Sequence, residues 1–389
     1  MWCLISVNIV QDLMRRKKRI ATRMTKEEGR RLKKRRKRKR IVFLLIEIIV
    51  FLVLCVVAYG IFKMDKLNFN ILDEQNLEVY QDTGPYTNIA LFGLDSRNNE
   101  LESGVQSDSI MIASINNETN EVKLVSVYRD TLLRQKDGTY EKANSAYNRG
   151  GAEEAISLLN RNLDLDIKNY ISVNFTALVK VIDELGGIDL DMTEEEADWC
   201  NKYAIETARV AGVECKDIPV ENGTQHVDGV HAVAYARIRY TEGNDFKRAE
   251  RQRIVLEKTA QKAKEADFLT LNNIIDEVFP LISTSFSLQN LLGFASNALN
   301  YSIVETEGFP YKVTTSENVI DHTGSYVVPI DFSENVKKLH EKLFENTDYQ
   351  LSDTVLQISD DIIYLTGVTE ETEAVTTTFE EDIEDENAQ

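Results

Sequence analysis

The sequence lacks the short motifs that mark many well-known enzyme classes. It contains neither GxGxxG nor GxxxxGKS/T, so nucleotide binding by a Rossmann or P-loop turn is unsupported, and it contains neither GxSxG nor HExxH. There is no CxxC pair to indicate a zinc site. The four histidines have no spacing typical of a metal site: His226, His231, His322 and His340. Any chemistry must therefore come from other side chains.

Basic charge is scarce over most of the chain. Residues 1–40 contain 17 Lys and Arg against 3 Asp and Glu, a net charge of +14, whereas the whole chain carries −19 and the remainder therefore −33. In a nucleic-acid-binding domain the folded face itself is basic, which is the opposite pattern. We therefore expect no nucleic-acid partner.

Long apolar runs are also rare, but one stands out directly after the basic segment. Ile41–Phe62 covers 22 residues with a single charge, Glu47. A helix of that length spans roughly 33 Å, enough to cross a bilayer. The alternative is a cleaved signal peptide, whose apolar part is usually about 7–15 residues and ends at a small-residue cleavage site. The polar sequence from Lys63 offers no such site, so we predict one uncleaved transmembrane helix at 41–62.

The charge asymmetry predicts the orientation of that helix. Basic residues favour the cytoplasmic side, so residues 1–40 are expected in the cytoplasm and the chain after about residue 63 outside the cell membrane. Cys200 and Cys215 then lie in an oxidising compartment, 15 residues apart. They are candidates for a disulfide, and two free thiols are the alternative.

The remaining chain has the pattern of one mixed α/β domain. We predict a stalk at 63–85, a domain at 86–366 with a polar insertion at 193–225, and an acidic disordered tail at 367–389. Alternating and apolar runs predict strands at 87–94, 109–115, 121–127, 171–175, 188–192, 311–314, 326–329 and 362–365. Helical spacing predicts helices at 152–162, 176–185, 227–236, 246–266 and within 268–299. The expected fold is a single extracytoplasmic α/β/α domain with a central mixed β-sheet flanked by helices, preceded by the transmembrane helix.

The first three strands predict a cluster of charge at one edge of the sheet. If the middle strand is antiparallel to its neighbours, Asp95, Asp108, Arg129 and Asp130 meet where the strands end. Two carboxylates and an arginine suit a divalent cation together with an anion, since Mg²⁺ binds carboxylates and completes its shell with phosphate oxygens. The alternative is a set of loop-capping aspartates beside a surface arginine.

A second cluster combines arginines with an aspartate and a glutamine. Its members are Arg237, Arg239, Asp245, Arg248, Arg251 and Gln252. Guanidinium groups stay protonated and bind phosphate through paired donors, so several in one place predict a phosphate or pyrophosphate site. A surface helix with ion pairs to Glu250 and Glu257 is the alternative.

Local geometry refines this expectation. In an extended segment Arg237 and Arg239 would point to the same side. Asp245 is expected to cap the N-terminus of a helix beginning at Phe246, and on that helix Arg248, Arg251 and Gln252 would share a face.

Eight motifs in one order resemble the LytR-CpsA-Psr family of cell-wall glycopolymer ligases, over about residues 86–300. They are Ile89–Arg97 (IALFGLDSR), Ser107–Met111 (SDSIM), Ser126–Thr131 (SVYRDT), Lys142–Gly151 (KANSAYNRGG), Val173–Phe175 (VNF), Asp183–Asp189 (DELGGID), Gly229–Arg239 (ending AYARIR) and Asp245–Gln252 (DFKRAERQ). The family often has proline where Tyr128 stands and glutamine where Arg253 stands, which puts substrate detail in doubt rather than the reaction.

The resemblance implies a membrane phosphotransferase of a Gram-positive type envelope. It would transfer a teichoic acid or capsular glycopolymer from a polyprenyl-pyrophosphate carrier to peptidoglycan and release polyprenyl phosphate. The lipid tail would need an apolar groove, for which Phe268–Ala298 is the expected cover. Pyrophosphate would be bound by Arg97, Arg129, Arg237, Arg239, Arg248 and Gln252. Mg²⁺ or Mn²⁺ would be held by Asp95 and Asp108, and catalysis would involve Asp245, Arg129 and Arg239, with an edge aspartate as the alternative base to Asp245.

Two other functions fit the same residues. A pyrophosphatase acting on the lipid carrier would use the arginines and metal with water as the nucleophile. A non-catalytic regulator of the cell envelope would not need them for catalysis at all.

Overall fold

The computed structural model describes residues 14–18, 68–80, 83–96, 101–317 and 324–377. The chain divides into two compact units, Met1–Phe62 and Lys63–Gln389. Among the described residues, none of the helices has the length and apolar character needed to cross a bilayer. The predicted transmembrane helix at 41–62 and Arg97 lie outside the described residues.

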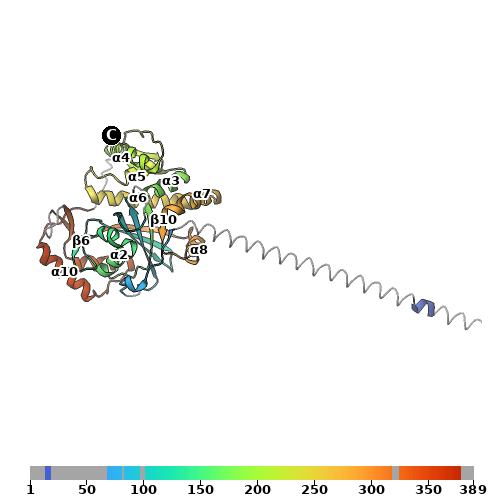
Figure 1. Ribbon diagram of the computed structural model, residues 1–389, viewed down its shortest axis with the longest axis horizontal. Coiled ribbons are helices and arrows are strands. Elements are labelled where there is room, and N and C mark those ends of the chain that lie inside the picture. The colour runs from blue at the N-terminus through green and yellow to red at the C-terminus, as the bar shows by residue number, and fades with distance from the viewer. Residues whose placement is uncertain (1–13, 19–67, 81–82, 97–100, 318–323, 378–389) are drawn as a thin grey trace, which may run out of the picture. The chain divides into compact units, whose positions relative to one another are not determined.

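A seven-stranded mixed sheet forms the centre of the second unit (Figure 1). Its strands lie in the order β1 (Asn68–Phe69), β10 (Ile282–Thr284), β7 (Asn169–Asn174), β2 (Tyr86–Leu94), β3 (Ser107–Asn116), β4 (Glu121–Val127) and β11 (Ser302–Phe309). β3 is antiparallel to both β2 and β4, whereas β7 is parallel to β2 and β11 to β4. The predicted meander and the predicted mixed sheet are therefore confirmed.

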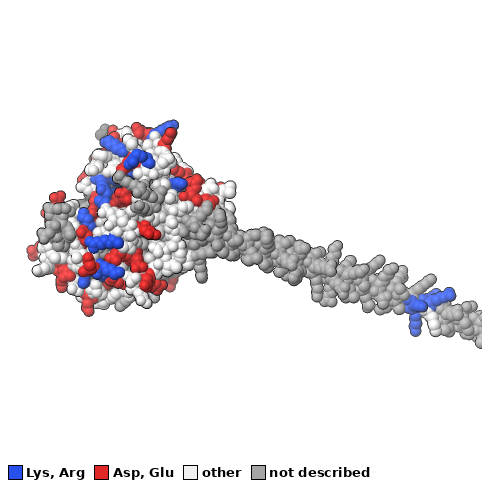
Figure 2. Space-filling model, in the orientation of Figure 1, with Lys and Arg blue, Asp and Glu red and all other residues white. Residues whose placement is uncertain are grey.

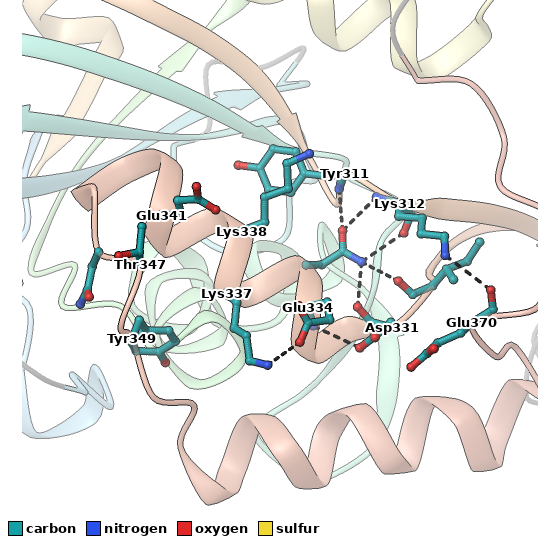
Figure 3. Close-up of a pocket in the computed structure, with 13 residues that line it drawn as sticks. Tyr311, Lys312, Asp331, Glu334, Lys337, Lys338, Glu341, Thr347, Tyr349 and Glu370 are labelled. Atoms are coloured by element: carbon teal, nitrogen blue, oxygen red, sulfur yellow. Dashed lines mark hydrogen bonds and ion pairs between the residues drawn. The ribbon is translucent and has the colours of Figure 1, made fainter.

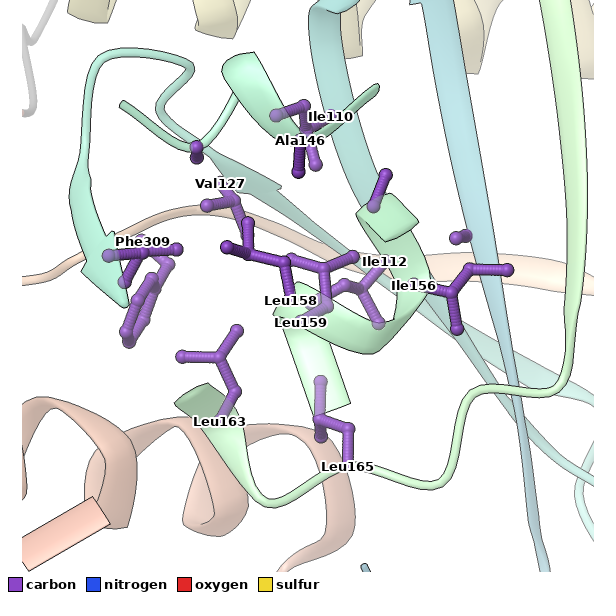
Figure 4. Packing of buried hydrophobic residues seen from close by; sticks show 14 of the residues in the cluster. Ile110, Ile112, Val127, Ala146, Ile156, Leu158, Leu159, Leu163, Leu165 and Phe309 are labelled. Carbon is purple, nitrogen blue, oxygen red and sulfur yellow. The ribbon is translucent and has the colours of Figure 1, made fainter. Parts of the chain in front are cut away.

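Apolar side chains of β2, β3 and β4 bury one face of this sheet under α2 (Ser145–Leu163). Figure 4 shows Ile110 and Ile112 of β3 and Val127 of β4 beside Ile156 and Leu159 of the helix, all buried. α9 (Phe332–Phe344) and α10 (Asp353–Thr366) add their apolar residues to the same core. Removing this apolar surface from water is the main force that holds the layers together.

The opposite face is covered by helices from the middle of the chain. α3 (Phe175–Glu184), α6 (Asn244–Glu265) and α8 (Leu288–Asn297) contact the strands. α4 (Glu194–Ala211), α5 (Gly229–Tyr235) and α7 (Phe268–Val278) pack against helices of this layer, α5 on α3 and α6, α4 on α5, and α7 on α3. Figure 1 shows α3, α5 and α6 on one side of the sheet and α2 and α10 on the other, which is the predicted α/β/α arrangement.

Short elements complete the unit. They are the helices η1 (Glu74–Asn76) and η2 (Phe279–Leu281) and three hairpins, β5 (Leu132–Arg134) with β6 (Tyr140–Lys142), β8 (Ile188–Met192) with β9 (Gly223–Val227), and β12 (Val313–Glu317) with β13 (Ser325–Pro329).

Several predicted boundaries are wrong. Residues 362–365 belong to α10 rather than to a strand, and β11 and α9 were not predicted. The predicted stalk contains Leu77, which is fully buried in the main core, so the domain begins before residue 86. In the predicted disordered tail, the Val375 N–H donates to Val313 O (2.9 Å), so this part of the tail lies on the domain.

The largest difference lies in the predicted polar insertion, because it contains α4. Thr193 caps this helix, because its side-chain oxygen accepts from the Glu196 N–H, and the Glu196 carboxylate in turn accepts from the Thr193 N–H. Gly212 ends it in the left-handed region, at φ 72°. This capping box followed by a C-terminal glycine is a helix signature that the sequence displays.

A Thr193→Ala variant should therefore be less stable. Loss of the cap leaves helix N–H groups without a partner and should lower the free energy of unfolding by about 1 kcal/mol. Urea denaturation of the variant measures this loss. Thr347→Ala, at an exposed loop position, is the control, and an equal loss in both variants would contradict the role of the cap.

Candidate functional site

A β-bulge places an acidic side chain at the end of the sheet. Gly93 of β2 pairs with Ser109 of β3, but the next residue, Leu94, pairs with Ser107, so Asp108 is the extra residue. Such a bulge turns a side chain out of the regular alternation. Asp108 consequently lines a charged pocket together with residues from β4 and α6.

Two arginines from distant parts of the chain meet at Asp108. Arg129, which follows β4, donates through Nη1 to Oδ1 at 2.6 Å. Arg239, from the turn after α5, reaches Oδ2 through Nη2 at 3.3 Å. The predicted neighbourhood of Asp108, Arg129 and Asp130 is therefore present, because Arg129 Nε also lies 3.4 Å from Asp130 Oδ2.

The first turn of α6 closes this pocket. Gly243, in the left-handed region at φ 84°, precedes the helix, so Asp245 lies inside the first turn and is not the predicted cap. Its Oδ1 is 3.2 Å from Arg248 Nη1 and 3.8 Å from Arg239 Nε. Gln252, one turn further along, lines the same pocket. The N-terminus of a long helix and these arginines favour an anion.

Burial and neighbouring charges shift the pKa values of three residues in the pocket. Burial lowers the pKa of Arg248 to about 10, opposed by Asp245, while Arg129 and Arg239 lower it further. Burial would raise the pKa of Asp245, but the three arginines outweigh it and hold that pKa below its usual value. Burial alone would lower the pKa of Arg129, but neighbouring carboxylates, foremost that of Asp108, raise it.

Several donors in this pocket are buried without a hydrogen-bond acceptor. Within the described part of the chain they include Arg129 Nε and both Nε and Nη1 of Arg248. Arg129 Nε and Arg248 Nη1 lie within ion-pair distance of Asp130 and Asp245 but form no hydrogen bond with them. A buried polar group without a partner costs about 1–3 kcal/mol, and more when it is charged. An anion with several oxygens would satisfy these donors, so the pocket has the chemistry of a phosphate or pyrophosphate site.

Lys142 is a further cation that the sequence analysis did not assign. Its Nζ lies 3.0 Å from Asp130 Oδ1, and Asp130 also contacts Arg129, so Lys142 belongs to the same network of charges. Its place in the motif KANSAYNRGG was the signal that could have identified it. Figure 2 shows basic side chains gathered in a band across the visible face of the domain, although the chain as a whole is acidic.

Arg237 and Arg251 do not converge on Asp108. The segment after α5 is a turn, and Arg237 donates to Thr207 Oγ1 (2.9 Å) and lies against the Phe175 ring. Arg251 is 1% exposed and bonds through Nε to Glu196 Oε1 at 2.8 Å. The prediction that Arg251 shares the phosphate-binding face of its helix is therefore wrong.

An apolar cavity of about 250 Å³ adjoins the charged pocket. Its walls come from β2, β3 and β7 and from α3, α5 and α6, and they include Leu91, Met111, Val173, Leu178, Val233, Val255 and Leu256. Asp108 and Gln252 line both spaces, and Arg237 lines the cavity. Of the predicted cover at 268–298, no side chain that the structure describes lines the cavity. A ligand that combines an anionic group with an apolar chain would fit across the two.

The predicted metal ligands lie near each other in the fold. Asp95 directly follows Leu94, the last residue of β2, and Leu94 pairs with Ser107, the first residue of β3. Asp95 and Asp108 therefore lie at the same edge of the sheet. Both are hard oxygen donors of the kind that Mg²⁺ and Mn²⁺ prefer. Among the described residues, no group of three or more His, Cys, Asp or Glu side chains is arranged to hold a metal by itself. Of the two, Asp108 lines the charged pocket, and its carboxylate accepts hydrogen bonds from Arg129 and Arg239.

Cys200 and Cys215, both described, are free thiols, so the structure does not contain the predicted disulfide. Cys200 lies on α4, where its side chain is buried in a hydrophobic cluster, and its Sγ donates to His231 O at 3.2 Å. Cys215 is half-buried beyond the end of that helix. Burial raises the pKa of Cys200 to about 12, which makes its thiol unreactive at neutral pH.

The two departures from the usual motif lie close together. The Arg253 guanidinium lowers the pKa of Tyr128, although burial raises it overall. The Tyr128 ring packs edge-on against Phe246 of α6, with ring centroids 4.7 Å apart. Its hydroxyl lies over Gly308, where an added Cβ would come within 2.0 Å of it. Tyr128 directly precedes Arg129 in the sequence, so these contacts adjoin the charged pocket.

A separate open pocket of about 680 Å³ lies beside α9 (Figure 3). Its charged groups already have partners, since Lys337 pairs with Glu334 and Lys312 donates to Glu370 O. The buried Asn335 amide bonds to backbone groups of Tyr311 and Lys312, just before β12, and of Ile330 in the turn before α9. The described residues that line this pocket include no arginine, so it has no counterpart to the buried guanidinium donors of Arg129 and Arg248.

Comparison with known sequences identifies the family. The sequence pattern of the LytR_cpsA_psr family matches residues 59–342, which is more than half of the chain. The chain belongs to the LytR_cpsA_psr family. All the described residues that line the charged pocket and the apolar cavity lie inside this LytR_cpsA_psr region.

Individual members of the LytR_cpsA_psr family are similar at a moderate level. A polyisoprenyl-teichoic acid–peptidoglycan teichoic acid transferase, TagV of Bacillus subtilis, is 26% identical over 67% of this chain and 64% of its own length. Biofilm regulatory protein A of Streptococcus mutans is 26% identical over 71% of this chain and 74% of its own. The solved structure of an Enterococcus faecalis protein described as a transcriptional regulator is 25% identical, with a TM-score of 0.54, over 72% of this chain and 95% of its own.

Proposed function

We propose that this protein is a membrane-anchored phosphotransferase that moves a glycopolymer from a polyprenyl-pyrophosphate carrier to peptidoglycan. The observation that carries the proposal is the charged pocket with unsatisfied arginine donors, directly beside an apolar cavity. A pyrophosphate with a long hydrocarbon tail matches both. The similarity to TagV, which is described as a teichoic acid transferase, supports the same class of reaction.

In this mechanism the arginines bind and neutralise the pyrophosphate. Arg129, Arg239 and Arg248 would donate to its oxygens and stabilise the charge that develops during transfer. The acceptor hydroxyl attacks the phosphorus next to the glycan, a new P–O bond forms, and the bond to the bridging oxygen breaks. The bridging oxygen leaves with the polyprenyl phosphate.

The proton of the acceptor hydroxyl needs a base. Asp245 is ionised in the free protein because the arginines hold its pKa low. When the pyrophosphate binds these arginines, their effect on Asp245 weakens and its pKa rises, which makes it a better base. An edge aspartate such as Asp130 is the alternative, and Gln252 would orient a phosphate oxygen.

A divalent cation is part of the proposal. Asp95 and Asp108 would hold Mg²⁺ or Mn²⁺, which when bound supplies further positive charge to the phosphate oxygens. We also propose that residues 1–40 are cytoplasmic, that 41–62 span the cell membrane and that the catalytic domain is extracytoplasmic. The apolar cavity would then receive a lipid from the outer leaflet.

The proposal predicts acceptor-dependent release of polyprenyl phosphate. The full chain in vesicles, given a polyprenyl-pyrophosphate-linked glycan, should release polyprenyl phosphate in step with glycan attachment only when peptidoglycan is supplied. Release and attachment are measured by chromatography of the lipid and wall fractions. Equal release without peptidoglycan would instead establish a pyrophosphatase.

A regulatory role is the second candidate, because one relative is described as a biofilm regulatory protein. No release under any of these conditions, from a chain that is correctly folded, would favour it.

A further inference from the structure

The helix α7 carries an apolar surface that the domain does not bury. Its first eight residues, Phe268–Ile275, contain no charged side chain. Within α7, every residue of which is described, only Val278 is fully buried. Phe268 is 74% exposed, Leu269 69% and Leu271 41%. Large apolar side chains exposed together on a monomer mark an interaction site.

The chain enters the domain beside this helix. α7 leads through η2 into β10, and β10 pairs in parallel with β1. Asn68 of β1 donates through Nδ2 to the carbonyl oxygens of Pro280 (2.9 Å) and Ile282 (3.2 Å). Next to it, Phe69 is 47% and Ile71 80% exposed. In Figure 1, α7, β10 and α8 lie on the same side of the domain.

The distance along the chain limits what can cover this surface. The apolar run 41–62 ends six residues before Asn68, so the connection can extend to at most about 21 Å. If 41–62 span the membrane, as the proposed function holds, the outer surface of the bilayer is always within reach of β1 and α7. A second copy of this acidic chain would have to overcome repulsion between like net charges.

The apolar lining of the substrate cavity extends toward the same region. Leu91, Ile171 and Leu256 line the cavity and also pack in a cluster with Leu291 and Phe294 of α8. Apolar contact therefore continues from the arginine pocket to α8. A lipid bound along this path would have its tail directed to the part of the domain that carries α7.

We propose that α7 and the segment Phe69–Ile71 form a docking surface for the bilayer interface. Phe268, Leu269, Leu271, Phe69 and Ile71 enter the region between headgroups and acyl chains, as in interfacial helices. The contact fixes the domain on the membrane with its apolar cavity close to the lipid that carries the substrate. This inference rests on the proposed membrane anchor.

The test places a fluorescent probe on the full chain in vesicles of phosphatidylglycerol and phosphatidylethanolamine. Cys3, Cys55 and Cys215 are replaced by Ser, while the fully buried Cys200 remains. A probe at Leu271→Cys should be quenched several-fold more by lipids brominated on their acyl chains than a probe at Ile205→Cys. Ile205 is 68% exposed on α4 and serves as the matched control. Equal, weak quenching at both positions would overturn the docking surface.

A second measurement distinguishes docking through α7 from membrane attachment through residues 41–62 and from glycan transfer. A probe at Ile71→Cys should be quenched, and the triple variant Phe268→Ser, Leu269→Ser, Leu271→Ser should reduce that quenching at unchanged helical content. Unchanged quenching in the triple variant would remove α7 from the surface. A chain that transfers glycan but shows no quenching contradicts the docking surface alone, whereas a quenched chain without transfer contradicts the proposed function alone.

Discussion

An Arg239→Ala variant is expected to lose roughly 10²–10³-fold in kcat for glycan transfer, the usual effect of removing one donor from a charge-stabilising site. Arg239 is 38% exposed and reaches both Asp108 and Asp245, so its guanidinium faces the space where the phosphate would lie. The free energy of unfolding should hardly change, because removing the Arg239 charge also removes its repulsion of the Arg129 and Arg248 guanidinium groups. Transfer assays and thermal unfolding of the same preparation measure both effects.

The control for this variant removes an equal charge elsewhere. Arg209→Ala, on α4, deletes a 70% exposed arginine whose nearest ion pair is long, at 3.8 Å to Glu206. It should leave transfer and stability unchanged. Arg239→Lys should recover part of the activity, since it keeps the charge but loses the paired donors. A fall of more than about 4 °C in the melting temperature of Arg239→Ala, with kcat unaffected, would show a structural role instead.

An Arg251→Ala variant is expected to lose about 3–5 kcal/mol of unfolding free energy, because it leaves a buried carboxylate without its partner. Arg251 bonds to Glu196 of α4, to Ile238 O (3.3 Å) and to Thr241 Oγ1 (2.6 Å). It therefore links α6, α4 and the turn that carries Arg239. Urea denaturation gives the loss directly.

A double replacement tests the cause of this loss. Arg251→Met combined with Glu196→Met exchanges the buried pair for apolar side chains of similar volume and should recover much of the stability. Arg209→Ala again serves as the surface control. If Arg251→Ala unfolds at the same urea concentration as the unmodified protein, the buried link does not contribute to the fold.

The sequence allows the edge of the sheet to be predicted because its causes are local. Alternating apolar residues and the turn at 116–120 make β3 and β4 neighbours, and β2 pairs with them in the expected direction. Asp108 and Arg129 then meet as a consequence of strand order. The bulge that turns Asp108 toward the pocket is a long-range detail of register, which the spacing of residues does not reveal.

Arg237 and Arg251 have partners that the sequence analysis did not predict, although Arg237 also lines the apolar cavity together with Asp108. Both arginines were grouped with the phosphate site, and their partners lie far away in the sequence. Those partners, Thr207 and Glu196, belong to α4. The capping box that marks α4 in the sequence was overlooked, and with it the groups on α4 that bind these two arginines. The N-cap of α6 was predicted at Asp245 and is wrong for a local reason. Gly243, whose backbone is in the left-handed region, is the N-cap residue instead.

The contact between Tyr128 and Gly308 limits the order in which this part of the molecule can change during evolution. Any side chain at 308 would overlap the tyrosine hydroxyl, because even a Cβ would lie 2.0 Å from it. Proline at 128 would leave that space empty and tolerate a larger residue opposite. Tyrosine at 128 and a residue larger than glycine at 308 are therefore incompatible unless the ring moves, so a change at either position depends on the residue at the other.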